Sequence, residues 1–159
     1  MDSAKSLGER LLAHREVLVT AESCTGGGVA TAITDIAGSS QWFDRAYISY
    51  SNEAKMEMLG VHAETLAQHG AVSEETVKEM VLGALQRSNA TIGVSISGIA
   101  GPGGGTEQKP VGSVCFAWAN KQGWLEVRTY QLDGDRQQVR QQAVELAIKV
   151  LYEQLSRLK

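Results

Sequence analysis

Short apolar runs alternate along this chain with longer stretches in which apolar residues recur every three or four positions. A short apolar run bounded by turn residues is typical of a buried strand, and a period near 3.6 is typical of a helix with one buried face. The runs that predict strands are 17–21, 46–50, 90–96, 111–119 and 124–132. The stretches that predict helices are 4–15, 29–36, 51–61, 62–68, 73–88 and 134–158.

The order of these elements predicts the fold class. The first three strands alternate with helices, and a four-residue connection, 120–123, then joins the last two strands in the manner of an antiparallel hairpin. The nearly continuous apolar character of 90–96 predicts a central strand that is buried on both faces. We therefore expect one α/β domain over residues 1–159, with a mixed β-sheet in a three-layer α/β/α arrangement.

The composition suits one folded domain and excludes several classes of partner. Hydrophobic residues make up 43% of the 159 residues, enough for a core without metals or disulfides. A net charge of −3 and a pI of about 5.6 argue against nucleic-acid binding through a broad basic face. The chain has no apolar run long enough to span a membrane and no apolar signal core at its start. We expect a cytoplasmic protein with neither a nucleic-acid nor a membrane partner.

The cysteines and histidines predict neither a disulfide nor a metal site. Cys24 and Cys115 are far apart in the sequence, and Cys115 lies in an apolar run that predicts a core position. The histidines His14, His62 and His69 form no pair with the spacing of metal ligands.

A polar turn at residues 20–28 follows the first predicted strand and precedes a helix. In open α/β sheets, ligands bind beyond the carboxyl ends of strands, and the free N–H groups at a helix start favour negative charge. Ser23, Cys24 and Thr25 stand in this turn, and the three glycines that follow allow a ligand to approach the backbone. Ser, Thr and Gly are also ordinary helix-cap residues, and on this pattern alone a cap without function is the commoner explanation.

A second candidate lies at residues 50–55, where a predicted strand ends and a helix begins with Ser51 or Asn52 as its cap. Lys55 then falls in the first helical turn, where the positive end of the helix dipole and burial both disfavour its charged form. A lysine that loses its proton easily can act as a general base, and Tyr50 could relay the proton or fix the lysine. The alternative is an ordinary solvated lysine.

Two further segments follow predicted strands. The glycine-rich stretch 97–105 could cradle a phosphate or a ring with backbone N–H groups, although it lacks the Lys-Ser/Thr ending of a P-loop and also fits a flexible loop. Arg136 opens the last helix and could hold a phosphate in bidentate fashion, or be a surface arginine behind an Asp cap.

One shared pocket would combine these segments. A serine nucleophile, a lysine base and backbone donors would supply acyl transfer without a Ser-His-Asp triad. None of the segments contains a histidine, which favours a lysine base.

Six motifs of the chain match a known family. They are Thr-Ala-Glu-Ser-Cys-Thr-Gly-Gly at 20–27, Asp-Ile-Ala-Gly-Ser-Ser at 35–40, Tyr-Ser-Asn-Glu-Ala-Lys at 50–55, His-Gly-Ala-Val-Ser at 69–73, Ser-Ile-Ser-Gly-Ile-Ala-Gly-Pro at 95–102 and Lys-Pro-Val-Gly at 109–112. The chain resembles the nicotinamide-nucleotide amidase (NMN deamidase) family, which is related to the C-terminal domain of the competence/damage-inducible protein CinA. The resemblance covers most of residues 17–140 and implies a stand-alone form of this domain.

The resemblance implies hydrolysis of the carboxamide of nicotinamide mononucleotide to nicotinic acid mononucleotide and ammonia, in pyridine-nucleotide salvage, without a cofactor or a metal. It assigns Ser23 as the nucleophile, and Lys55 as the base that takes the serine proton directly or through Tyr50. N–H groups around residues 25–27 would hold the oxyanion. The residues then expected to bind the substrate are Thr25, Gly26, Gly27, Ser40, Ser97, Gly98 and Arg136, the last four from their positions alone.

Two other functions use the same pocket: a non-catalytic nucleotide-binding or regulatory module, and hydrolysis of a different amide or ester. The presence of Ser23, Tyr50 and Lys55 together favours an enzyme. Exposed helix faces and a hairpin edge favour a homo-oligomer, a dimer or higher.

Overall fold

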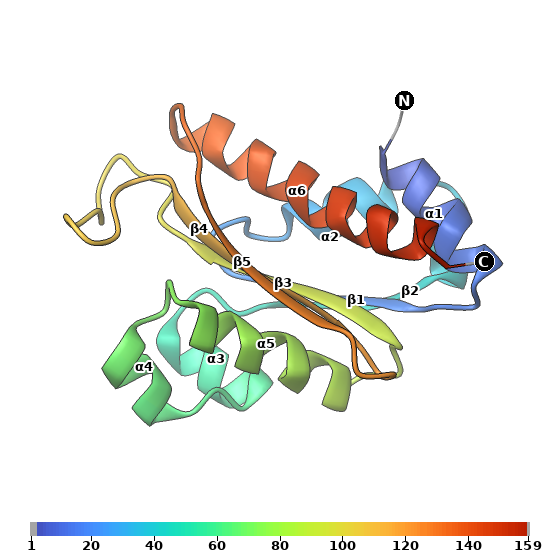
Figure 1. Cartoon of the computed structure of the whole chain (residues 1–159), viewed down its shortest axis with the longest axis horizontal. Helices are drawn as coiled ribbons and strands as arrows, with labels where there is room; N and C mark the ends of the chain where they lie inside the picture. Colours follow the sequence, from blue (N-terminus) through green and yellow to red (C-terminus); the bar gives the residue numbers. More distant parts are fainter. Residues whose placement is uncertain (1–2, 159) are drawn as a thin grey trace.

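The structure is a computed structural model that describes residues 3–158. A five-stranded sheet lies between two layers of helices (Figure 1). Its strands are β1 (Leu18–Glu22), β2 (Phe43–Ile48), β3 (Ile92–Gly98), β4 (Ser113–Asn120) and β5 (Leu125–Gln131). The helices are α1 (Ser3–Ala13), α2 (Gly28–Thr34), the 3-10 turn η1 (Ser39–Gln41), α3 (Asn52–Leu59), α4 (Ala63–His69), α5 (Glu74–Gln86) and α6 (Arg136–Ser156). The predicted domain also includes residues 1, 2 and 159, which lie outside the described residues.

The strand order is β2-β1-β3-β4-β5, with β2, β1 and β3 parallel and β4 and β5 antiparallel. This confirms the predicted mixed sheet, the α/β class and the closing hairpin. Glu22, the last residue of β1, pairs with Ile48 on one side and Ile96 on the other. The connections that follow β1, β2 and β3 therefore leave the sheet at one end, the carboxyl end of these strands, where β4 also begins.

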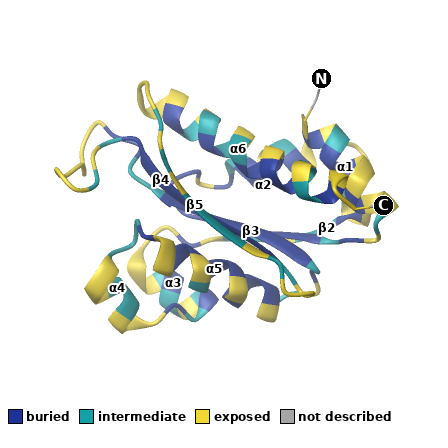
Figure 2. Cartoon of the chain, viewed as in Figure 1, coloured by how far each residue is buried: buried dark blue, intermediate teal, exposed yellow. Residues whose placement is uncertain are grey.

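Two apolar cores fill the spaces between the sheet and the helices, and Figure 2 shows that the exposed residues gather on the outer helix faces and in the loops. One core lies under α1, α2 and α6, and includes Leu7, Leu11, Ile33, Phe116, Trp118 and Leu151. The other lies under α3, α4 and α5, and includes Val19, Val77, Met80, Val81 and Cys115. Six of the seven residues of β3 are buried, which confirms its central position.

The bounds of β2 differ from the predicted ones at both ends. β2 begins at Phe43, which pairs with Leu18, and ends at Ile48, whereas the apolar run predicted 46–50. This strand is at the edge of the sheet and has a partner on one side only, so it accommodates the polar Asp44 and Arg45 that obscured its start. The turn η1 was not predicted.

The start of α6 is held by a capping box. The Asp135 side chain accepts a hydrogen bond from the Gln138 N–H (2.9 Å), and the Gln138 side chain accepts one from the Asp135 N–H (2.9 Å). The cap fixes where the helix begins, and therefore where Arg136 and Arg140 reach the edge of the sheet. Within residues 3–158, no helix combines the length and the apolar character needed to cross a membrane.

Candidate active site

Ser23 and Lys55 meet beyond the carboxyl ends of β1 and β2, as the sequence predicted. Lys55 Nζ lies 3.0 Å from Ser23 Oγ, 3.0 Å from the Ser49 carbonyl oxygen and 2.9 Å from the Tyr50 carbonyl oxygen. A neutral lysine amine has two N–H bonds and one lone pair. The two carbonyls can take both N–H groups, which leaves the lone pair facing the hydroxyl of Ser23. This geometry suits proton transfer from serine to lysine.

Burial sets the protonation of Lys55. Its side chain is only 1% exposed, and this loss of solvent lowers the pKa of its ammonium below the ordinary value of 10.5, against a smaller opposing effect of the Cys24 thiol. The neutral form of Lys55 is therefore more populated at neutral pH than that of a surface lysine. The helix that carries Lys55 is capped by Ser51, and not by Asn52, because the Ser51 side chain accepts a hydrogen bond from the Ala54 N–H (3.0 Å).

Cys24 lies beside Ser23 but belongs to the apolar core. Its side chain is 6% exposed, and burial raises the pKa of the Cys24 thiol to about 11. Because the thiolate is the nucleophilic form, this thiol is a poor nucleophile at neutral pH. The structure thus favours Ser23 over Cys24.

The start of α2 is filled by the side chain of Glu22. Its Oε1 accepts hydrogen bonds from the N–H groups of Gly27 (3.2 Å) and Val29 (3.0 Å), and its Oε2 accepts one from the N–H group of Ala30 (3.0 Å). Thr25 Oγ1 also donates to Oε1 (2.6 Å). The helix start that the sequence offered to an anionic ligand is therefore occupied by the protein's own carboxylate.

This occupancy changes which donors can face an oxyanion. The Gly26 N–H donates to the Ser23 carbonyl (3.0 Å), and the Gly27 N–H donates to Glu22, so neither is free as the sequence analysis expected. Among the described residues, the N–H groups of Cys24 and Thr25 have no main-chain hydrogen-bond acceptor. Of the donors expected at residues 25–27, the Thr25 N–H is therefore the one left, and the Cys24 N–H joins it next to Ser23.

Arg140 of α6 holds the same turn from outside, a contact that the sequence analysis missed. Its Nε donates to the Cys24 carbonyl (3.0 Å) and its Nη2 to the Thr25 carbonyl (3.3 Å). Because residues four apart share a face of a helix, the position of Arg140 after Arg136 was a signal that both side chains reach one place.

Tyr50 contributes its main chain to the pair. Its carbonyl oxygen accepts from Lys55 and lies 3.3 Å from Ser23 Oγ, whereas its side chain is 61% exposed. The phenol oxygen makes a long contact of 3.5 Å with Nη2 of Arg136, whose Nη1 donates to the Gly101 carbonyl (2.7 Å). The structure thus gives the phenol a partner on α6, away from the lysine amine.

The other residues expected to bind substrate fall in different places. Ser97 follows Ile96, which pairs with Glu22, so it is level with Ser23 on the neighbouring strand. At Gly98, a Cβ atom would lie 2.8 Å from Val114 Cγ2, which makes close strand packing the reason for the glycine. Ser40 lies in η1, before the start of β2, and hence at the amino ends of the parallel strands, opposite to Ser23. The structure does not bring Ser40 to this site, because the motif of Ser40 precedes β2 whereas the motif of Ser23 follows β1.

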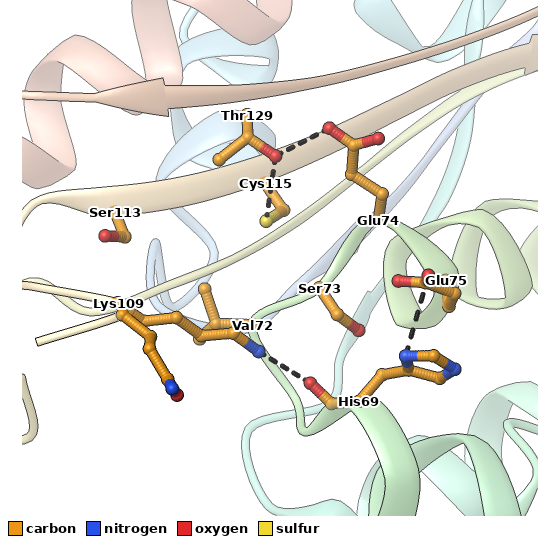
Figure 3. A pocket seen from close by; sticks show the side chains of 10 residues that line it. His69, Val72, Ser73, Glu74, Glu75, Lys109, Ser113, Cys115 and Thr129 are labelled. Atoms are coloured by element: carbon orange, nitrogen blue, oxygen red, sulfur yellow. Dashed lines mark hydrogen bonds and ion pairs between the residues drawn. The ribbon is translucent and has the colours of Figure 1, made fainter. Parts of the chain in front are cut away.

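A cavity of about 340 Å3 lies elsewhere, between α4, α5 and the hairpin strands (Figure 3). Lys109 Nζ donates to the His69 carbonyl (2.6 Å), and Thr129 donates to Glu74 (2.7 Å) across this cavity. It is lined by neither Ser23 nor Lys55. The cavity is therefore distinct from the site built around the serine.

Fold and site together define a class: α/β proteins that hold a serine hydroxyl against a buried lysine amine at the carboxyl edge of a mixed sheet. The chain belongs to the family of the CinA C-terminal domain, whose model matches residues 1–155. This confirms the resemblance found in the sequence motifs.

Three relatives place the chain within this family. Nicotinamide-nucleotide amidohydrolase PncC of Escherichia coli K12 is 54% identical over 154 residues, which cover 97% of this chain and 93% of that protein. The crystal structure of competence/damage inducible protein CihA from Agrobacterium tumefaciens matches with a TM-score of 0.90 and 42% identity, covering 98% of this chain and 96% of that chain. Competence damage-inducible protein A from Klebsiella pneumoniae matches with a TM-score of 0.94 and 39% identity, covering 99% and 97%.

Proposed function

We propose that this protein hydrolyses the carboxamide of nicotinamide mononucleotide to nicotinic acid mononucleotide and ammonia, in pyridine-nucleotide salvage. The pairing of Ser23 Oγ with the buried amine of Lys55 at 3.0 Å carries the proposal, because it is the arrangement of a nucleophile and its base. The 54% identity to a protein named nicotinamide-nucleotide amidohydrolase supports the substrate.

The first half of the reaction acylates Ser23. Neutral Lys55 takes the hydroxyl proton as Ser23 Oγ bonds to the carboxamide carbon, and the electron pair of the C=O bond moves to its oxygen. The N–H groups of Cys24 and Thr25 hold this oxyanion, an interaction of several kcal/mol in such sites. The ammonium of Lys55 then returns its proton to the carboxamide nitrogen, the C–N bond breaks, and ammonia leaves.

The second half releases the acid. Lys55, neutral again, takes a proton from a water molecule as that water adds to the acyl ester. The tetrahedral intermediate then collapses, Ser23 Oγ leaves with the proton held by Lys55, and nicotinic acid mononucleotide departs. Each half needs only one base, and both transfers use the lone pair that the Ser49 and Tyr50 carbonyls leave free.

The nucleotide phosphate is assigned to Arg136. Its guanidinium is exposed, planar and suited to two parallel hydrogen bonds with phosphate oxygens. The exposed Gly26 leaves room for a ligand beside the turn. Ser97, level with Ser23 on the neighbouring strand, supplies a second hydroxyl. Tyr50 forms the exposed rim between Arg136 and the serine, a wall against which the pyridinium ring can lie.

Ammonia release from nicotinamide mononucleotide, measured for the wild type and Ser23→Ala with and without a chelator, tests the proposal. We expect release by the wild type alone, unaffected by the chelator. Binding of the nucleotide without release would instead identify a nucleotide-binding module, and release by Ser23→Ala would show that the nucleophile is another residue. The cytoplasmic location and the homo-oligomeric state stay predictions, the second measurable by sedimentation.

A further inference from the structure

The carboxylate of Glu22 is fully buried and lies one residue before the nucleophile. We propose that Glu22 is a positioning residue, which holds the turn after β1 so that the Ser23 hydroxyl and the N–H groups of Cys24 and Thr25 face the substrate. This inference rests on the proposed function in taking Ser23 as the nucleophile. It assigns a role to a side chain that touches neither substrate nor Lys55.

The donors around the carboxylate come from the whole length of the turn. Thr25 lies two residues after the nucleophile, Gly27 closes the turn, and Val29 and Ala30 belong to the first turn of α2. One side chain thus connects four positions between residues 25 and 30. Because both carboxylate oxygens accept hydrogen bonds from backbone N–H groups, the side chain fixes the path of the backbone, in addition to placing a negative charge at the helix start.

The main chain of Glu22 makes a second connection, toward the lysine. Its carbonyl oxygen accepts hydrogen bonds from the Ser49 N–H (2.8 Å) and the Ser49 hydroxyl (3.3 Å). The carbonyl of Ser49 in turn accepts from Lys55 Nζ (3.0 Å). Glu22 therefore links the segment that carries the nucleophile to the segment that orients the base.

The Glu22 carboxylate matters for the proposed reaction because it determines which N–H groups are left for the oxyanion. The carboxylate accounts for Gly27, Val29 and Ala30, and the turn itself accounts for Gly26. What remains beside Ser23 is the pair of N–H groups assigned to the oxyanion. If the carboxylate were removed, the freed N–H groups of the helix start would compete for the carbonyls and anions of this turn, and the pair would lose its fixed direction.

Glu22→Gln is the direct test, because its amide has the same shape. Backbone N–H groups face both carboxylate oxygens, so the NH2 group meets an N–H donor whichever way the amide turns. We expect kcat for ammonia release to fall about 100-fold, the effect of losing preorganised oxyanion donors, with KM within about threefold of the wild type. The matched control is Glu16→Gln, a buried glutamate before the other end of β1, whose kcat should equal that of the wild type.

A second pair of variants decides the question if Glu22→Gln does not fold, as judged by its thermal melt. Thr25→Val removes the 2.6 Å hydrogen bond to Glu22, whereas Thr25→Ser retains the hydroxyl. Both leave the N–H group of residue 25 in place. We expect Thr25→Val to lose at least about fivefold more kcat than Thr25→Ser, since hydrogen bonds to charged groups are the strong ones.

The rate at which a fluorophosphonate labels Ser23 separates this inference from the proposed function. In that reaction Ser23 Oγ bonds to phosphorus and fluoride leaves, so no nucleotide is needed. Failure of the wild type to release ammonia while Ser23 is labelled would overturn the substrate only. A folded Glu22→Gln protein that keeps its kcat and labelling rate within threefold of the wild type, or that loses affinity alone, would overturn the role of Glu22. Equal kcat values for Thr25→Val and Thr25→Ser would do the same.

Discussion

The connections after β1 and after β3 leave the same edge of the sheet, but they are held in different ways. Residues 23–27 are buried except for Gly26, and are fixed by the Glu22 carboxylate inside and the Arg140 guanidinium outside. Residues 102–108 are exposed, and the loop that contains them is tied by long side chains, Arg136 to the Gly101 carbonyl and Lys109 to the His69 carbonyl. The comparison indicates that the proposed nucleophile stands on the more constrained connection, whereas the exposed connection has fewer internal restraints.

Replacement of Lys55 gives the largest effect expected on the rigid side. Lys55→Met keeps the apolar stem but removes the base, and we expect kcat to fall about 1000-fold, within the range for lost general-base catalysis. Lys55→Arg is the matched control, since a guanidinium keeps the charge but does not deprotonate, and it should be equally inactive. Steady-state ammonia release measures both. An active Lys55→Arg protein would show that charge, and not proton transfer, is what the residue supplies.

Alanine at one glycine of each connection tests the contrast directly. Gly27 has φ of 96°, and its Cβ atom would lie 3.0 Å from Ile48 Cδ1, so we expect Gly27→Ala to lower the free energy of unfolding by about 1–3 kcal/mol. Gly103 has open space where a Cβ atom would lie, and Gly103→Ala should change the free energy of unfolding by less than about 0.5 kcal/mol. Urea unfolding measures both values. Equal losses would mean that the two connections are equally constrained.

The pH profile reports the environment of the base. Because burial lowers the pKa of Lys55 below 10.5 and the neutral amine is the proposed active form, kcat/KM should rise with pH along a limb whose midpoint lies below pH 10.5. Below that midpoint each pH unit should reduce kcat/KM about tenfold. A profile that falls with rising pH over this limb would contradict a lysine base.

Replacement of Arg136, which contacts the connection after β3, should have the smallest effect on turnover. Arg136→Gln should raise KM about tenfold through loss of a charge-assisted hydrogen bond to phosphate, with kcat within about threefold. Nicotinamide riboside, which lacks the phosphate, provides the control, because its KM should be the same for both proteins. A fall in kcat with unchanged KM would place Arg136 among the groups that act on the reacting atoms.

The sequence predicted the fold well because its strands and helices differ in periodicity and because the connections have clear cap residues. Its errors fall where tertiary contacts decide: β2 begins among polar residues because it is an edge strand, and β3 runs on through Ser97 and Gly98 because β4 pairs with them. No local pattern carries that information.

The site was predicted in part, for a similar reason. Ser23 and Lys55 follow neighbouring parallel strands, so position alone placed them together. The sequence analysis placed Glu22 in the polar turn 20–28 but considered only the turn's hydroxyls, thiol and glycines, although a carboxylate before a helix is a favourable partner for free N–H groups. Arg140 acts across 116 residues of sequence, on the Cys24 carbonyl. Ser40 was assigned from its position alone, and only the sheet register shows that it lies at the end of the sheet opposite Ser23.

Two of the three contacts of the Lys55 amine are made by main-chain carbonyls, at residues 49 and 50. Every amino acid has such a carbonyl, so no single substitution can delete either one. Sequence drift at these two positions therefore alters the chemistry only if it bends the backbone. Anyone grafting this serine–lysine pair onto another scaffold would need to copy a path of the chain, since the side chains alone do not encode it.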